Sequence, residues 1–201
     1  MSDPYPALYP ALCRQFTATR NVGYEGLRDD SDFARQPIRE AAVLVAITDR
    51  AEPGVLLTER PQTMAKHPGQ IAFPGGKWED GETARTAALR EAEEELAIPP
   101  QTAQIVGEGH SFVTGTGFNL TPVVAVVPPD LAIRPDPREV HDWFEAPLAH
   151  LLDPGNHKRK IGIFLGNERP YYEIDWRGRR IWGITAGILV NLSHRFDLAA
   201  L

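Results

Sequence analysis

The segment Thr83–Leu96 constrains the fold of this chain more than any other. It is rich in Ala, Glu, Leu and Arg, which favour helix, and a Pro-Pro pair follows it closely. At about 100° per residue, Glu91, Glu94 and Glu95 fall within one arc of roughly 100°. An apolar stripe lies beside that arc, so we expect a helix that packs on a sheet and carries glutamates at the border of the buried face. The stripe consists of Ala88, Leu89, Ala92 and Leu96.

These three carboxylates repel one another, and partial burial strengthens the repulsion. Arg90 is the one cation of the helix that lies near them. A hard divalent cation with oxygen ligands would remove the conflict, which favours Mg²⁺ or Mn²⁺. A solvated charged face is the ordinary alternative for such a run of charges, and the spacing alone leaves both interpretations open.

The remaining pattern predicts an α/β fold with a mixed sheet between helices. Ala41–Ile47 is a continuous apolar run, typical of a strand buried on both faces, and Val55–Thr58 predicts its neighbour. Residues 1–37 are interpreted as an N-terminal extension with a short helix near Leu12–Thr17. Further strands are expected near Gln104–Glu108, Pro122–Val127, Ile161–Leu165, Tyr171–Trp176 and Arg180–Trp182, and a final helix over Thr185–Arg195.

Composition excludes several classes of protein. The 201 residues carry a net charge of −6 without a basic run, which argues against nucleic acid as a partner. The apolar runs are far shorter than a membrane span, and the first residues lack the pattern of a secretory signal. Cys13 is the single cysteine, which suits a reducing compartment and predicts a cytoplasmic location. The apolar segment Ile161–Leu165 leaves a homodimer open.

A glycine-rich loop precedes the acidic helix. In Phe73-Pro74-Gly75-Gly76, the paired glycines let the backbone approach a metal or phosphate without Cβ interference. Gly76 is followed after five residues by Glu82, and after seven more by Arg90-Glu-Ala-Glu-Glu-Glu. This spacing resembles the Nudix box, here running from Gly76 to Ile98. It departs from the consensus at two positions, Ala92 for a bulkier aliphatic residue and Ala97 for glycine; the second should cost about 1 kcal/mol if the left-handed conformation is kept.

A second stretch resembles the upstream motif of Nudix coenzyme A diphosphatases. It consists of Leu56–Arg60 and Gly69–Gly76, and it departs from that motif at Pro61 and Ala65. The resemblance implies a Nudix hydrolase domain over residues 38–201 with an α/β/α sandwich fold. It also implies metal-dependent hydrolysis of coenzyme A to 4′-phosphopantetheine and adenosine 3′,5′-bisphosphate. Hydrolysis of another substrate, such as ADP-ribose or a dinucleotide, is the alternative, and a non-catalytic nucleotide-binding module is a third.

The resemblance also implies roles for individual residues. Arg90 would orient the glutamates, and either Glu94 or Glu139 would take the proton from the attacking water. Glu139 has an equally good interpretation as a solvated loop residue. Coenzyme A carries a 3′-phosphate, which a cationic side chain would bind, and Arg60 ranks first among the candidates for this contact, before Lys66 and His67. Gly76 would also contact the substrate. The implied metal ligands are Glu91, Glu94, Glu95 and the carbonyl of Gly75, with Glu82 beside them.

Overall fold

The computed structural model describes residues 8–19, 23, 26, 27, 29–32, 34–63, 68–164 and 167–200. Its helices are α1 (Leu8–Ala18), α2 (Ala84–Leu96), α3 (Leu148–Leu152) and α4 (Ile184–Ser193), with short 3₁₀ turns at Pro100–Thr102, Pro154–Asn156 and Leu198–Ala200. Its strands are β1 (Arg39–Thr48), β2 (Gly54–Glu59), β3 (Ile71–Ala72), β4 (Gly75–Lys77), β5 (Gln104–Glu108), β6 (Phe112–Val113), β7 (Phe118–Val127), β8 (Asp142–Pro147), β9 (Lys158–Phe164), β10 (Asn167–Trp176) and β11 (Arg179–Trp182).

The main sheet has eight strands and is mixed, as the sequence predicts. Its central order is β3-β2-β1-β7-β5, and β4, β6 and β8 pair with β1, β7 and β2 respectively. β1 and β7 run parallel over their whole length, whereas the other pairs are antiparallel. The last three strands form a separate antiparallel sheet in the order β11-β10-β9, a division that the sequence pattern does not reveal.

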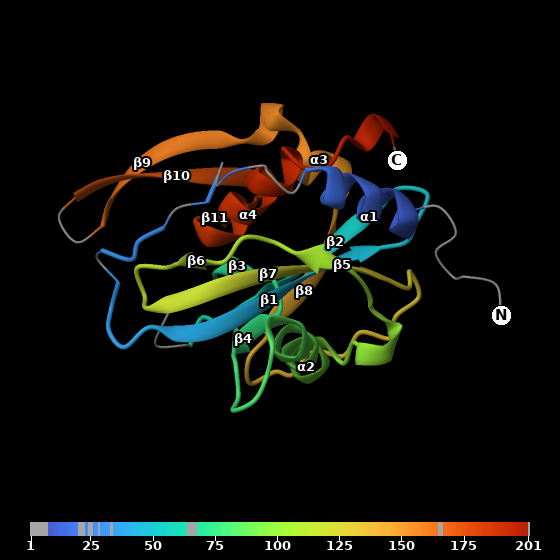
Figure 1. Ribbon diagram of the computed structural model, residues 1–201, viewed down its shortest axis with the longest axis horizontal. Coiled ribbons are helices and arrows are strands. Elements are labelled where there is room, and N and C mark those ends of the chain that lie inside the picture. Colours follow the sequence, from blue (N-terminus) through green and yellow to red (C-terminus); the bar gives the residue numbers. More distant parts are fainter. Residues whose placement is uncertain are drawn as a thin grey trace.

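Helices cover both faces of the main sheet, which confirms the predicted fold class. In Figure 1, α2 lies on one side of the sheet, and α1, α3, α4 and the small sheet lie on the other. β1 supplies side chains to both cores. Ala42 and Leu44 pack with α2, and Val45 and Ile47 pack with the core under α1 and α4. All four side chains are fully buried, so β1 is buried on both faces as expected.

Several elements differ from the sequence-based expectation: the short elements β4, β6 and α3 were not predicted. β8 was not predicted, because its acidic residues and terminal proline lower strand propensity. In the fold those acids find cationic partners: Asp142 pairs with Arg179 and Glu145 with Arg50. The short N-terminal helix begins earlier than predicted, at Leu8, and its buried residues join the main core.

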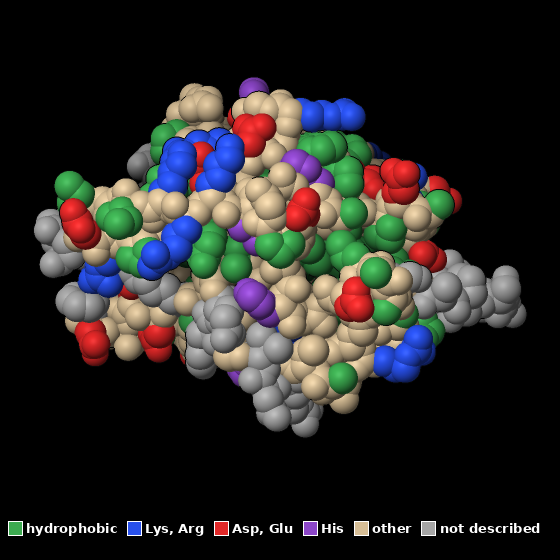
Figure 2. Space-filling view, turned by 90° about the horizontal axis from the view of Figure 1, so that it is seen from above, with side chains coloured by type: hydrophobic (Ala, Val, Ile, Leu, Met, Phe, Trp, Pro, Cys, Tyr) green, Lys and Arg blue, Asp and Glu red, His purple; other side chains and the backbone are tan. Residues whose placement is uncertain are grey.

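The surface above the small sheet carries charges of both signs. Figure 2 shows this face, where basic side chains lie beside acidic ones. Glu173 on β10 pairs with Lys160 at 2.7 Å and with Arg180 at 2.5 Å. Among the described residues, no helix is long and apolar enough to span a bilayer.

Candidate active site

Helix α2 is defined by local interactions at both ends. Thr83 is the N-cap, and it forms a reciprocal capping box with Thr86, whose hydroxyl accepts from the Thr83 N–H at 2.8 Å. The helix ends at Ala97, which adopts the left-handed conformation with φ 57° and ψ 35°. Ala97 therefore adopts the left-handed conformation that glycine favours at this position, and the cost of about 1 kcal/mol expected from the sequence applies. The helix packs through Ala84, Ala87, Ala88, Ala92 and Leu96, which are buried.

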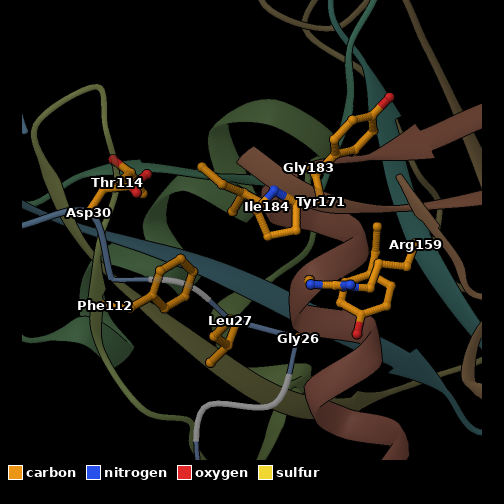
Figure 3. Close-up of a pocket in the computed structure, with 12 residues that line it drawn as sticks. Gly26, Leu27, Asp30, Phe112, Thr114, Arg159, Tyr171, Gly183 and Ile184 are labelled. Atoms are coloured by element: carbon orange, nitrogen blue, oxygen red, sulfur yellow. The ribbon is translucent and has the colours of Figure 1, made fainter. Parts of the chain in front are cut away.

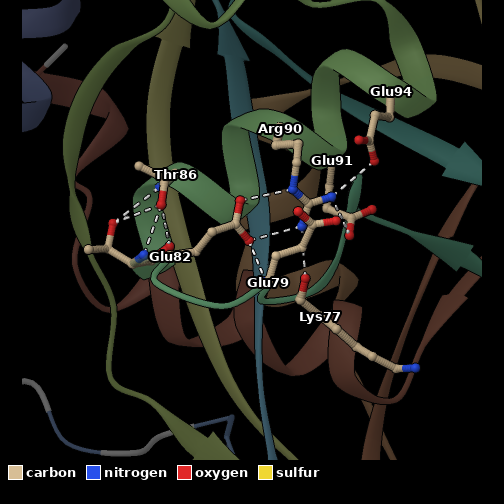
Figure 4. A network of polar contacts seen from close by, with 8 residues as sticks. Lys77, Glu79, Glu82, Thr86, Arg90, Glu91 and Glu94 are labelled. Carbon is tan, nitrogen blue, oxygen red and sulfur yellow. Dashed lines mark hydrogen bonds and ion pairs between the residues drawn. The ribbon is translucent and has the colours of Figure 1, made fainter.

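Arg90 organises what we call the outer group, Glu82 and Glu94. Its Nε and Nη2 donate to the two carboxylate oxygens of Glu82 at 2.9 and 3.0 Å, and its Nη1 donates to Glu94 at 3.0 Å. It also donates to the Lys77 carbonyl at 2.9 Å and to Glu91 at 3.1 Å, so that all five N–H donors are used (Figure 4). The guanidinium thus holds three carboxylates and one loop at fixed positions.

Electrostatics in the outer group are favourable. The hydrogen bonds from Arg90 lower the pKa of Glu82 below its ordinary value. The carboxylate of Glu82 also accepts the Glu79 N–H at 2.7 Å, which fixes the turn before the helix. Glu94 stays 58% exposed. The Arg90 guanidinium therefore compensates the charge of both carboxylates in the outer group.

Glu91, Glu95 and Glu139 form what we call the inner group. Their carboxylate oxygens lie within 4.8 Å of one another. Glu95 is only 5% exposed, while Glu139 reaches the group from a loop. Within the described part of the chain, no ion pair includes Glu95 or Glu139, and Glu91 contacts Arg90 alone. The inner group therefore concentrates negative charge with little compensation.

The loop that carries Glu139 is held against the end of α2. Backbone N–H groups of Arg134 and Asp136 donate to the carbonyls of Leu96 and Glu95 at 3.0 and 2.9 Å. The last carbonyls of a helix have no partner within it, so these bonds satisfy them and fix the loop. Val140 is buried in the core beside α2, and it anchors the far side of Glu139.

Burial and mutual repulsion raise the pKa values of the inner acids. Burial is the main cause at Glu95, followed by the charges of Glu91 and Glu139, and its pKa rises to about 8. Arg60 and the Gly75 backbone offset part of this rise. Burial also raises the pKa of Glu91, against the opposing effect of Arg90.

The two glycines of β4 make room for this group. β4 pairs with β1 so that Gly76 lies opposite Ala42 and Gly75 opposite Val43. A Cβ on Gly76 would collide with the carboxylate of Glu91, and a Cβ on Gly75 would collide with the backbone of Ala42 and Val43. The glycine pair is therefore required by close packing against β1 and Glu91, whereas the sequence alone predicts that the glycines make room for a metal or a phosphate.

The inner group opens into a cavity of about 1240 Å³. Gly75, Gly76, Arg60 and Glu94 also line it, so the structure brings most of the predicted site residues together. Glu82 is not among the lining residues and lies behind Arg90, while Lys66 and His67 fall outside the described residues. Three lining cations, Arg35, Arg39 and Lys77, were not predicted as site residues. Arg35 and Arg39 were missed because they precede the motifs in sequence.

A smaller cavity of about 430 Å³ adjoins the first and shares Thr114 and Ile184 with it. In Figure 3, Phe112 and Leu27 face Ile184 and Tyr171 across it. Its charged lining residues are Arg159 and Asp30, and Asp30 pairs with Arg169 at 3.5 Å. Among the described residues that line this cavity, Asp30 is the one acid, whereas the larger cavity contains the inner group.

The inner group fits a divalent cation. Its donors are carboxylate oxygens, which Mg²⁺ and Mn²⁺ prefer. Burial, followed by the charges of Glu91 and Glu139, raises the pKa of Glu95, and a bound cation would offset both effects. Two of the predicted ligands, Glu91 and Glu95, belong to this group, whereas Glu94 and Glu82 lie with Arg90. Glu139 is the third carboxylate of the inner group.

Comparison with known proteins identifies the family. The model of the NUDIX domain matches residues 38–164, more than half of the chain. The chain belongs to the Nudix hydrolase family.

Relatives agree with this assignment. The Nudix hydrolase is 43% identical over 157 residues to an Escherichia coli strain SMS-3-5 protein named "Uncharacterized Nudix hydrolase NudL", a match that covers 77% of this chain and 81% of the relative. The protein of the same name from Cronobacter sakazakii is 43% identical over 156 residues, with the same coverage. The solved structure of RenU, a Nudix hydrolase from M. smegmatis, has the same fold, with 24% identity, a TM-score of 0.50, and coverage of 57% of this chain and 74% of that chain.

The family defines the chemistry in general terms. This Nudix hydrolase is an enzyme that hydrolyses a small nucleoside diphosphate derivative, and the family uses divalent metal ions. Arg90 fixes the positions of the carboxylates of Glu82, Glu91 and Glu94 through hydrogen bonds. The inner group brings three carboxylate oxygens close together. From the sequence, Glu139 is one of two candidates for taking the proton, beside Glu94; the position of Glu139 next to Glu91 and Glu95 is a result of the fold.

Proposed function

We propose that this Nudix hydrolase cleaves the diphosphate bond of coenzyme A, releasing 4′-phosphopantetheine and adenosine 3′,5′-bisphosphate. One observation carries the proposal. The segment that resembles the coenzyme A diphosphatase motif, residues 56–76, contributes a wall of the catalytic cavity. Its lining residues are Arg60, Gln70, Ala72, Phe73, Gly75 and Gly76.

The proposed roles follow from the two groups of acids. Glu91 and Glu95, with the carbonyl of Gly75, would hold Mg²⁺ or Mn²⁺; the roles of Glu94 and Glu82 as ligands stay predictions. When bound, such a cation neutralises diphosphate oxygens and lowers the pKa of a bound water. Arg90 keeps Glu91 in position through its hydrogen bond at 3.1 Å. Positioning and electrostatics then supply most of the rate.

Glu139 is our choice for the group that takes the proton from the attacking water. It lines the cavity beside Glu91 and Glu95. Glu94, the other candidate, already accepts a hydrogen bond from Arg90 at 3.0 Å and does not belong to the inner group. If the Glu139→Gln variant keeps its turnover and the Glu94→Gln variant is inactive, Glu94 and not Glu139 takes the proton.

Arg60 stays our sequence-based candidate for a contact with the 3′-phosphate. It lines the cavity, and its Nε is buried without a hydrogen-bond partner among the described residues. A buried donor of this kind is available to a ligand. If Arg60→Ala weakens coenzyme A and 3′-dephospho-coenzyme A equally, this role is wrong.

We place the reaction in the cytoplasm, since the single cysteine suits a reducing compartment.

We also propose a homodimer through β9, which is an edge strand of the small sheet in the described part of the chain. Ile161 and Ile163 on this strand are 65% and 81% exposed, and a second copy would cover them. Light scattering of the wild type and of an Ile161→Lys, Ile163→Lys variant measures the state directly.

The activity test compares substrates on the full chain. Coenzyme A, ADP-ribose and diadenosine polyphosphates are incubated with the protein in Mg²⁺, Mn²⁺ or chelator, and the products are separated by anion-exchange chromatography. The proposal expects adenosine 3′,5′-bisphosphate from coenzyme A at the highest kcat/KM, and no product in chelator. Preferred cleavage of ADP-ribose or of a dinucleotide would overturn the coenzyme A assignment.

A further inference from the structure

Two arginines line the catalytic cavity at the end remote from the inner group. They are Arg35, before the first strand, and Arg39, the first residue of β1. The Nudix box and the upstream motif include neither of them. Their position is set by contacts with the loop Thr114–Gly117, which lines the same end of the cavity.

The backbone fixes this end of the cavity firmly. Arg39 N–H donates to the Gly117 carbonyl at 3.1 Å, and Arg35 N–H donates to the Gly115 carbonyl at 3.4 Å. Gly117 has φ +86°, and a Cβ at this position would collide with the Arg35 carbonyl. Glycine is therefore needed here for conformation and for space, and the two segments pack at close range.

The pleat of β1 directs Arg39 into the cavity. Side chains alternate along a strand, so Arg39, Ala41 and Val43 share one face, and all three line the cavity. The intervening Glu40 points to the opposite face, where Asn119 donates to its carboxylate at 3.0 Å. The guanidinium of Arg39 lies 4.8 Å from the ring centroid of Phe118, its partner on β7, which orients it without consuming its N–H donors.

Arg39 is too far along the strand to compensate the inner group. Val43 lies opposite Gly75, next to the acids, and four residues of strand from there to Arg39 span about 13 Å. Arg60, by contrast, interacts electrostatically with Glu95. Arg60 therefore lies near the inner group, where the proposed function places the diphosphate, whereas Arg35 and Arg39 lie at the other end of the cavity.

We propose that Arg39, together with Arg35, forms a second anion subsite that binds a phosphate monoester of the substrate. The inference rests on the proposed function, because it assigns to this subsite the phosphate on the ribose of coenzyme A, in place of the sequence-based candidate Arg60, which interacts with Glu95. Arginine suits such a group, since its planar fork donates two parallel hydrogen bonds to phosphate oxygens. The preferred substrates are then nucleoside diphosphate derivatives that carry an additional phosphate away from the bond that breaks.

The test uses the full chain with Arg39→Gln and Arg35→Gln. Arg14→Gln is the matched control, because Arg14 is an exposed arginine on α1 that does not line the cavity. For Arg39→Gln we expect kcat/KM for coenzyme A to fall roughly 10- to 100-fold, mainly through KM. The value for 3′-dephospho-coenzyme A should change by less than about 3-fold. Equal losses with both substrates, or a loss with coenzyme A as large in Arg14→Gln, would overturn the subsite.

A binding measurement separates this inference from the proposed function. Calorimetry of the protein in chelator compares adenosine 3′,5′-bisphosphate with AMP, which lacks the 3′-phosphate. Wild type should prefer the bisphosphate, and Arg39→Gln should lose that preference, more clearly at low salt. A protein that fails to cleave coenzyme A yet shows this preference would lose the proposed function and keep the subsite. The same preference in wild type and Arg39→Gln would remove the subsite and leave the function standing.

Discussion

The outer and inner groups consist of the same residue type at or near helix α2 and differ in their electrostatics. Glu82 and Glu94 are held by Arg90, which lowers the pKa of Glu82. Glu95 follows Glu94 directly on the helix, but it is buried, and its pKa rises to about 8. The difference lies in the partners that the fold supplies, a five-donor guanidinium in one case and further carboxylates in the other. The compensated acids hold the structure in place, whereas the uncompensated acids are the ones that we propose bind a cation.

The largest effect should come from the inner group. Glu95→Gln and Glu91→Gln remove a charge at nearly constant shape, and we expect each to lower kcat about 1000-fold at saturating Mg²⁺ because charge stabilisation by the cation is lost. Glu94→Gln is the matched outer variant and should lose at most about 10-fold. Steady-state kinetics measure all three. An equal loss in Glu94→Gln would return this residue to the metal site and end the distinction between the groups.

Arg90→Gln should have the next largest effect, on stability as well as on rate. Removing the guanidinium leaves the carboxylates of Glu82 and Glu91 without their main partner, both of them mostly buried. We expect a loss of about 2 kcal/mol in the free energy of unfolding, measured in urea without metal, and a fall in kcat of about 10-fold or more. Unchanged stability would show that the outer group is held by other contacts.

The glycine pair allows position and stability to be separated. Gly76→Ala places a methyl group against the carboxylate of Glu91, whose end can move, so activity should fall about 10-fold with little loss of stability. Gly75→Ala meets the backbone of β1, which cannot move, so the protein should lose stability by about 2 kcal/mol. Kinetics and thermal unfolding on the pair test this. The reverse order of effects would contradict the close approach of Gly76 to Glu91.

Without metal, the inner group should make stability depend on pH. The pKa of Glu95 is above its ordinary value of 4.5 in the folded protein and about 8, so folding favours the protonated form. Stability is then greatest below pH 4.5 and falls as pH rises toward 8. Urea unfolding in chelator from pH 5 to 8 should show this fall, and Glu95→Gln should flatten it. If the free energy of unfolding depends on pH in the same way in the wild type and in Glu95→Gln, burial of Glu95 is not the cause of the fall in stability.

The smallest effect provides a baseline for the helix itself. Ala97 has φ 57°, a conformation in which glycine is favoured. Ala97→Gly should therefore raise the free energy of unfolding by about 0.5–1 kcal/mol and leave kcat unchanged. Thermal unfolding measures the shift. A change in kcat would show that the end of α2 controls the position of the inner group.

Local patterns account for the parts of this protein that were predictable. The span of α2, the buried strand β1 and the glycine loop follow from helix propensity, an apolar run and a close approach of backbone. The role of Arg90 in orienting the glutamates, implied by the family resemblance, agrees with its hydrogen bonds. β8 escaped prediction since its acidic residues are stabilised by Arg50 and Arg179, which lie far away in the sequence.

The sequence by itself determined that three glutamates share a helical face beside an apolar stripe, because that geometry depends only on the periodicity of a helix. The tertiary structure decided which acids meet. Glu139 reaches Glu91 and Glu95 because backbone N–H groups of its loop satisfy the last carbonyls of α2, and Arg39 enters the cavity because β1 pairs in register with β7. Contacts between segments distant along the chain depend on how the whole chain packs, and local patterns do not encode them.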